Sequence, residues 1–243
     1  MSVAELNLND EKRRFYEARS KEVIKNLIRR NMSGQFCATK SEALDAVMKL
    51  IPPGETVGRG DSMSLEQVGI LKELRRKGAN RVIDPFNWDA EGNRVFEGEE
   101  EPKTPKEVRR VFTEAMLADV FLSGTNAITL DGKLVNVDAY GNRVAGLIWA
   151  EKVIVVVGGN KIVADEKEAI ERTRSYAAPL NNYRHLLAHK MSKYANQPCV
   201  VAGKCMDCRQ LACICRYTVV IRGDTAHRTG HIHVVIVGED LGI

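Results

Sequence analysis

Five of the six cysteines of this chain lie in one short segment. Cys205 and Cys208 are separated by two residues, so both thiolates can hold one metal centre from a tight turn. Cys199 and Cys215 lie at loop distance on either side and complete a set of four sulfur ligands, with Cys213 as a fifth thiol nearby. Four thiolates suit a tetrahedral zinc ion or an iron–sulfur cluster, and the spacing does not distinguish them. Disulfides or free buried thiols are the alternatives.

Two glycine-containing loops could bind a small anion. The first is predicted to join a strand to a helix, where glycines admit a ligand and the helix N-terminus offers free N–H groups. Its candidate ligand-binding residues are Gly58, Gly60 and Ser62. It lacks the third glycine of a dinucleotide-binding loop, so an ordinary turn is the alternative. The second loop region adds the candidates Gly124, Thr125, Asn126, Asn136, Gly141, Asn142 and Arg143.

Two carboxylates near the second loop are candidate catalytic residues. Asp138 lies two residues after Asn136 on a strand-like segment, so both side chains can face one pocket, and Asp138 could act as a general base. Asp131 is a second candidate, although Asp-Gly is also the pair that a hairpin turn prefers. Arg143 could hold a carboxylate or phosphate. We expect this small-molecule site to lie apart from the cysteines.

The histidines give weaker indications of chemistry. His185 and His189 are four residues apart on a predicted helix, but the glutamate of a zinc-protease motif is missing, so we expect surface residues. His231 and His233 share one face of a predicted strand, where packed or exposed histidines are more common than metal ligands.

Composition narrows the class of protein. The 243 residues contain 36 Lys+Arg and 32 Asp+Glu, a net charge of +4, and 44% are hydrophobic, so the chain can build a core without disulfides or metal. Its longest aliphatic run, Val153 to Val157, is far shorter than the ~20 residues of a membrane span. The N-terminus does not resemble a secretory signal. We expect a cytoplasmic protein that binds neither membranes nor nucleic acid.

The elements that must position these residues alternate between helices and strands. Apolar periodicity and capping residues predict helices over 9–31, 40–50, 65–77, 105–118, 165–177 and 180–194. Short apolar runs predict strands over 55–60, 81–84, 120–123, 128–130, 134–137, 152–157, 217–222 and 231–237. Residues 85–103 read as a surface loop, either plainly solvated or acting as a lid. The pattern predicts one α/β domain over 1–243 with a mostly parallel sheet flanked by helices, an N-terminal helical segment (1–35) and a cysteine segment (198–216).

Three runs of the sequence closely resemble the LUD domain family, which is named for lactate utilization. They are VGRGDSMSL (Val57 to Leu65), LSGTNAITLDGKLVNVDAYGNRVAGLIWAEKVIVVVGGNKIV (Leu122 to Val163) and HIHVVIVGEDLG (His231 to Gly242). The segment PCVVAGKCMDCRQLACIC is similar to the cysteine-bearing end of an anaerobe-type branch, in which the matching positions are Cys199, Cys205, Cys208 and Cys215. Asp61 stands where a small residue is expected in that family.

The resemblance implies a fold akin to ribose-5-phosphate isomerase, glucosamine-6-phosphate deaminase and the CoA transferases. It also implies a component of lactate or 2-hydroxy-acid oxidation that binds a small anionic metabolite, with an iron–sulfur cluster, or alternatively zinc, at the cysteines. We expect redox partner subunits and a homo-oligomer. The rival hypotheses are a non-redox phosphosugar isomerase or transferase with structural zinc, and a ligand-binding subunit without catalysis.

Overall fold

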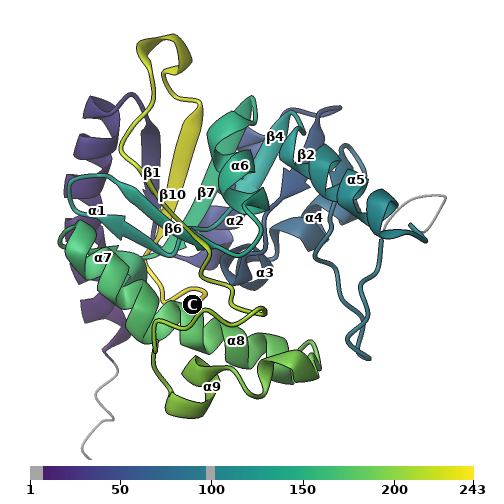
Figure 1. Ribbon diagram of the computed structural model, residues 1–243. Coiled ribbons are helices and arrows are strands. Elements are labelled where there is room, and N and C mark those ends of the chain that lie inside the picture. Colours follow the sequence, from purple (N-terminus) through teal and green to yellow (C-terminus); the bar gives the residue numbers. More distant parts are fainter. Residues whose placement is uncertain (1–7, 97–101) are drawn as a thin grey trace, which may run out of the picture.

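The computed structural model describes residues 8–96 and 102–243 of the chain. A six-stranded sheet lies at its centre, with every neighbouring pair of strands parallel (Figure 1). In spatial order its strands are β1 (Ser33–Cys37), β10 (Ile232–Val237), β7 (Lys152–Gly158), β4 (Val120–Ser123), β2 (Thr56–Arg59) and β3 (Arg81–Ile83). The predicted α/β class with a mostly parallel sheet is confirmed.

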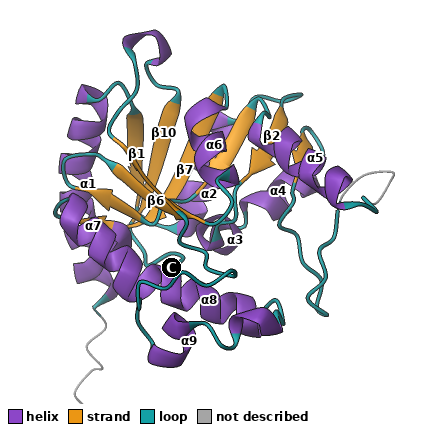
Figure 2. Ribbon diagram, viewed as in Figure 1, coloured by secondary structure: helices purple, strands orange, loops and turns teal. Residues whose placement is uncertain are grey.

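Helices cover both faces of this sheet (Figure 2). The helices are α1 (Asn9–Arg29), α2 (Lys40–Leu50), α3 (Met63–Val68), α4 (Ile70–Lys77), α5 (Pro105–Met116), α6 (Asn142–Trp149), α7 (Glu166–Arg172), α8 (Ala178–Leu187) and α9 (Pro198–Ala202). None of the helices in the described part of the chain is long and apolar enough to cross a membrane.

Strand β7 shows how the central sheet is held between two cores. Successive side chains of a strand point to opposite faces, so a continuous aliphatic run supplies both. Ile154 and Val156 pack with residues of α2, α3 and α4 on one face. Val153, Val155 and Val157 pack on the other face with α1, α6 and a second sheet. Burial on both sides explains why this strand lacks any polar alternation.

The second, smaller sheet has mixed strand directions. Its strands, in spatial order, are β8 (Ile162–Val163), β5 (Ala127–Thr129), β6 (Leu134–Asp138) and β9 (Tyr217–Ile221). Strands β5 and β6 form the hairpin that the Asp131-Gly132 pair predicts, and Gly132 adopts a φ of +83° at its turn. Strand β6 also pairs antiparallel with β9, which joins the end of the cysteine segment to the hairpin.

Local capping signals place two helix starts as predicted. Thr39 accepts a hydrogen bond from the backbone N–H of Glu42 at the start of α2. Thr104 and Glu107 form a reciprocal capping box at the start of α5, with Pro105 in the first turn. These side chains satisfy backbone donors that would otherwise lack partners.

Two element predictions are wrong, and one strand of the central sheet was missed. The helix expected over 65–77 is two helices, because Gly69 takes a left-handed φ of +82° between α3 and α4. Pro179 does not separate two helices: α7 continues through a π-helical stretch, residues 173–177, into α8, which ends at Leu187. A π-turn can accommodate the carbonyl that proline leaves unbonded. Strand β1 was not predicted, because it begins with the small or polar residues Ser33, Gly34 and Gln35 and only Phe36 and Cys37 are apolar.

Candidate functional site

A cleft of about 210 Å³ opens at the carboxyl ends of three neighbouring parallel strands. Asp61 follows β2, Gly124 follows β4 and Lys161 follows β7, and all three line the cleft. Parallel strands deliver their carboxyl ends to one edge of a sheet, which is where open α/β sheets commonly bind ligands. Helix α8 and the segment after β3 form further walls. We call this cleft the strand-end cavity.

The two glycine loops of the sequence analysis meet at this cavity. A Cβ atom on Gly60 would lie 2.7 Å from Cγ of Arg143, and one on Gly124 would lie 2.6 Å from Oγ of Ser62. The glycines therefore permit close contact between the loops rather than leaving room for a ligand. Gly58 has a different neighbour, because its Cβ would lie 1.9 Å from the carbonyl oxygen of Ala115 in α5.

Arg143, in the first turn of α6, binds four uncharged oxygens. Its guanidinium donates to the carbonyl oxygens of Val137 (2.7 Å) and Gly124 (3.4 Å) and to the side-chain oxygens of Asn126 (2.8 Å) and Asn136 (3.2 Å). It forms no ion pair with any described residue. Burial lowers its pKa, while the charges of Asp138 and Asp61 oppose that effect.

The carboxylate of Asp138 is occupied by backbone donors. One oxygen accepts from the N–H groups of Tyr140 and Gly141, and the other from Val144, each at 3.1 Å. Asp138 lines the strand-end cavity, yet these bonds fix the start of α6. A general base needs a free lone pair that is directed at the substrate. This geometry therefore gives Asp138 a structural role.

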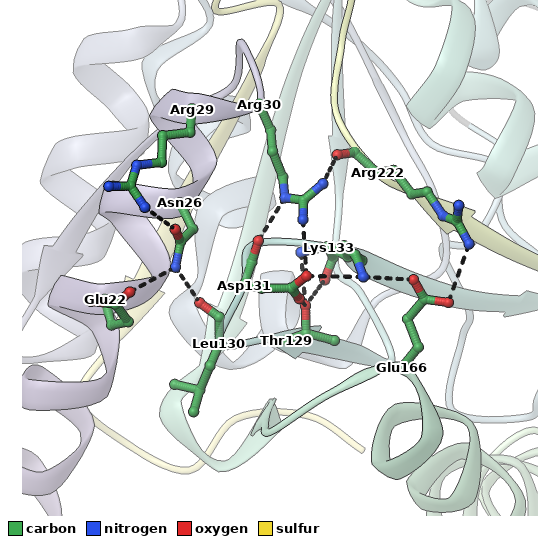
Figure 3. Close-up of polar contacts among 10 residues, drawn as sticks. All are labelled: Glu22, Asn26, Arg29, Arg30, Thr129, Leu130, Asp131, Lys133, Glu166 and Arg222. Atoms are coloured by element: carbon green, nitrogen blue, oxygen red, sulfur yellow. Dashed lines mark hydrogen bonds and ion pairs between the residues drawn. The ribbon is translucent and has the colours of Figure 1, made fainter.

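Asp131 lies outside the lining of the cavity, at the turn between β5 and β6 (Figure 3). Its carboxylate pairs with Arg30 of α1 and with Lys133, both at 2.9 Å. Lys133 also pairs with Glu166 of α7, at 2.8 Å. Burial would raise the pKa of Asp131, but the bonds from Thr129 and Lys133 and the nearby charges lower it overall. The network joins α1, the hairpin and α7, and the catalytic role predicted for Asp131 has no support in this position.

The only carboxylate of the cavity wall that forms an ion pair among the described residues is Asp61. It pairs with Arg184 of α8, and 23% of its side chain is exposed. Burial would raise its pKa, but the charge and hydrogen bond of Arg184, with help from Arg59 and His185, lower it to about 2. Asp61 is therefore ionised and neutralises Arg184. In the next residue along α8, burial and Arg184 lower the pKa of His185 to about 4, so this cavity-lining histidine is neutral at pH 7. The prediction that His185 and His189 are surface residues is wrong, because His185 lines the cavity and His189 is buried.

Lys161 has no such partner. Only 4% of this residue is exposed, and its Nζ lies 3.4 Å from the carbonyl oxygen of Thr125 and 3.4 Å from the hydroxyl of Ser64. It forms no ion pair within the described ranges. Burial, together with the charges of Arg172 and Arg143, lowers its pKa to about 7. Sequence reasoning missed this lysine, although its position just after a buried strand, behind Gly158 and Gly159, was an available signal.

The segment between β3 and α5 closes one side of the cavity. Phe86, Trp88 and Arg94 line the cavity, and Arg94 lies over the rings of Trp88 (4.9 Å) and Phe112 (5.1 Å). Trp88 also contacts His189 beyond α8, with ring centroids 4.3 Å apart. The part of this segment that is described, residues 85–96, thus covers the cavity rather than standing free in solvent. The acidic residues 97–101 lie outside the described residues.

The cysteine segment borders the cavity, which corrects the expectation that the two are separate. Ile214 lines the cavity, and its neighbours in sequence are Cys213 and Cys215. All the cysteines are free thiols. Burial and the neighbouring thiols of Cys213, Cys205 and Cys199 raise the pKa of Cys215 to about 12. Cys213, which the spacing leaves as an extra thiol, therefore lies within this group.

Thiols are suitable ligands for a soft metal ion, but the described side chains are not arranged around one. Within residues 8–96 and 102–243, no group of three or more His, Cys, Asp or Glu side chains is placed to hold a metal ion. Two sulfurs already accept backbone N–H bonds at 3.4 Å: Cys205 from Asp207, and Cys213 from Cys215. Bonds of this kind tune bound iron–sulfur clusters. Cys199 instead accepts from the side chain of Asn182, at 2.9 Å.

The structure therefore separates the predicted ligand-binding residues into two groups. Those that line the strand-end cavity are Ser62, Gly124, Thr125, Asn126, Asn142 and Arg143. Those that support it from behind, without lining it, are Gly58, Gly60, Asn136 and Gly141. The cationic residues of the wall that sequence reasoning missed are Arg94, Lys161, Arg184 and Lys193.

Comparison with known proteins gives one family. The LUD domain model matches residues 20–237. A DUF162 family protein from Deinococcus radiodurans is 14% identical with a TM-score of 0.46, over 91% of this chain and 97% of that chain. Ribose 5-phosphate isomerase A from Neisseria gonorrhoeae is 12% identical with a TM-score of 0.36, over 84% and 94%. The same enzyme from Methanocaldococcus jannaschii is 14% identical with a TM-score of 0.32, over 53% and 56%. No curated protein matches the sequence.

The role of Asp138 is tested by two substitutions. We expect Asp138→Ala to reduce the free energy of unfolding by about 1–2 kcal/mol, because three backbone donors lose their acceptor. Asp138→Asn keeps one acceptor oxygen and should cost less. Urea unfolding measures both. Wild-type stability in Asp138→Ala would mean that the carboxylate is free for chemistry.

The state of Lys161 is tested by the pH dependence of stability. Between pH 7 and the ordinary pKa of lysine, the unfolded chain binds a proton on Lys161 that the folded chain has lost, so the free energy of unfolding rises with pH. Lys161→Met should lack that rise and should be more stable at pH 7 by on the order of a few kcal/mol. The exposed Lys167→Met on α7 is the control. Equal pH slopes in wild type and Lys161→Met would disprove the uncharged buried amine.

Proposed function

This chain belongs to the LUD domain family, and on that premise we propose that it is a component of the oxidation of lactate or a related 2-hydroxy acid. The proposal assigns the small anionic acid to the strand-end cavity. It assigns a metal centre to the adjoining cysteine segment. Each assignment rests on a separate set of contacts and is tested separately.

The charge of the cavity wall is the observation that carries the proposal. Five basic side chains of lysine and arginine line it, and two side-chain carboxylates do. Asp61 is paired with Arg184, and Asp138 forms no ion pair among the described residues and only partly offsets the charge of Arg143. The basic groups without an ion-pair partner in the described part of the chain are Arg94, Arg143 and Lys161, which are partly or fully buried, and Lys193, which is exposed. Buried cations without counter-ions are costly, and an anionic ligand relieves that cost.

Arg94 is the group best placed to bind a carboxylate. The guanidinium of Arg143 is already occupied by four oxygens, whereas Arg94 is held by contact with aromatic rings and forms no ion pair with a described residue. A guanidinium of this kind can grip a carboxylate through two parallel hydrogen bonds. Lys161 could then meet the 2-hydroxyl or 2-oxo oxygen of the same acid. Uncharged His185 adds a donor or acceptor to the wall.

The cysteine segment supports a second component of the proposal. Cys199, Cys205, Cys208 and Cys215 would hold an iron–sulfur cluster, or alternatively zinc, with Cys213 as a further thiol in the group. A cluster would supply one-electron transfer beside the cavity, and zinc would fasten the segment to β9. Ile214 supports the pairing of the two sites because it belongs to both. Redox partner subunits, a homo-oligomer and a cytoplasmic location complete the proposal.

Binding of the acid is tested by calorimetry with L-lactate and with pyruvate. We expect either acid to bind the full-length protein, and Arg94→Gln to weaken binding about tenfold or more, because a charge-assisted hydrogen bond is lost. The control is Arg110→Gln, which alters an exposed arginine on α5 and should leave binding unchanged.

Two outcomes contradict this assignment. Binding that is equal in wild type and Arg94→Gln would place the acid elsewhere. Tight binding of ribose 5-phosphate, with neither lactate nor pyruvate bound, would favour the phosphosugar isomerase or transferase hypothesis instead.

The metal centre is tested on protein purified without oxygen. We expect a brown protein that contains iron, and loss of most of that iron in Cys208→Ser, because one of four sulfur ligands is removed. Cys37→Ala, at the buried end of β1 outside the cysteine segment, should keep it. A colourless protein with bound zinc would favour the structural alternative. A metal-free wild type, or unchanged metal in Cys208→Ser, would rule out the assigned ligands.

A further inference from the structure

Lys161 occupies an unusual position for a lysine. It ends the short 3-10 turn Gly159–Lys161 that follows β7, so a rigid buried strand sets its place. The residue is only 4% exposed, and it lines the strand-end cavity. A lysine that merely covered apolar surface would extend its ammonium into water.

The surroundings of Lys161 favour an uncharged amine. Its two hydrogen-bond partners are neutral oxygens, the carbonyl of Thr125 and the hydroxyl of Ser64. The charged groups that act on it are Arg172 and Arg143, and both are cationic. Arg172 is held nearby by a bond from its guanidinium to the carbonyl oxygen of Asn126, at 2.7 Å. With the pKa of Lys161 lowered to about 7, a large fraction of the amine is unprotonated and nucleophilic at neutral pH.

Burying this amine lowers the stability of the fold, and its contacts offer little compensation. Its two bonds are long, at 3.4 Å, and an apolar side chain of similar length would avoid the loss of solvation. Desolvated lysines of this kind attack carbonyl groups to form imines in other enzymes. The cavity beside it already carries the cationic groups that would hold the acid end of such a carbonyl compound.

We propose that Nζ of Lys161 forms an imine with the carbonyl carbon of a 2-oxo acid held in the strand-end cavity. This inference rests on the proposed function, because it takes the 2-oxo acid to be the oxidised partner of the 2-hydroxy acid bound there. It adds a covalent step and a nucleophile at that site.

The step balances without any further reactant. The nitrogen lone pair attacks the carbonyl carbon and forms a C–N bond while the C=O π pair moves to oxygen. A proton passes from nitrogen to that oxygen, which gives a carbinolamine. The nitrogen lone pair then forms the C=N bond as the hydroxyl leaves, and the remaining N–H proton joins the departing hydroxide to give water. The hydroxyl of Ser64, 3.4 Å from Nζ, is placed to relay the proton.

The test is reductive trapping on the full-length protein. Pyruvate is added with sodium cyanoborohydride, which reduces an imine to a stable secondary amine, and the product is analysed by mass spectrometry of the intact protein and its peptides. We expect one adduct, on the peptide that contains Lys161. It should be absent from Lys161→Met and Lys161→Arg and unchanged in Lys167→Met, an exposed lysine on α7.

Calorimetry of pyruvate on the same samples separates the possible failures. Binding of pyruvate without an adduct at Lys161 overturns the imine and leaves the proposed function standing. An adduct spread over surface lysines, and equal in Lys161→Met, also overturns it. If none of pyruvate, glyoxylate and 2-oxobutyrate binds or is trapped, the inference falls, and the proposed function falls with it when L-lactate does not bind either.

Discussion

The binding of one buried guanidinium by neutral oxygens organises the rest of this site. Arg143 donates to oxygens on the loop after β4 and on strand β6, and so joins the central sheet, the second sheet and α6 around one charge. Because those oxygens are uncharged, they orient Arg143 without cancelling its charge. The positive potential that remains acts on Lys161 next to it and on whatever enters the cavity.

The positions of the charged groups also explain why the carboxylates in and near the site are not available for catalysis. Asp138 fixes the first turn of α6, Asp131 ties α1 to the hairpin, and Asp61 neutralises Arg184. Each carboxylate is used where it holds two elements together. The cavity is left with a neutral histidine, a weakly basic lysine and a guanidinium stacked on aromatic rings, a set that suits an anion carrying a carbonyl or hydroxyl group.

The sequence predicted the elements better than the site. Thr104 with Glu107, the Asp131-Gly132 turn and the aliphatic run at Val153 act over a few residues, so their patterns suffice. The side chain of Lys161 depends on strand order instead: only when β7, β4 and β2 lie side by side does it face the two glycine loops. The glycines do mark places where the backbone comes close to another group. That group is Ala115 for Gly58 and Arg143 for Gly60, rather than a ligand. Likewise, the link between the cysteines and the cavity depends on Ile214, whose position follows from the pairing of β9 with β6.

The account depends most directly on the charge state of Lys161 in the folded protein. Its titration can be followed by NMR from the Cε and Hε signals of lysine, with Lys161→Met identifying the resonance. The account predicts that one lysine titrates with a pKa of about 7 while the exposed lysines titrate near their ordinary value of about 10.4. If the signal that disappears in Lys161→Met titrates with the exposed lysines, the amine is charged at neutral pH and the central claim is wrong.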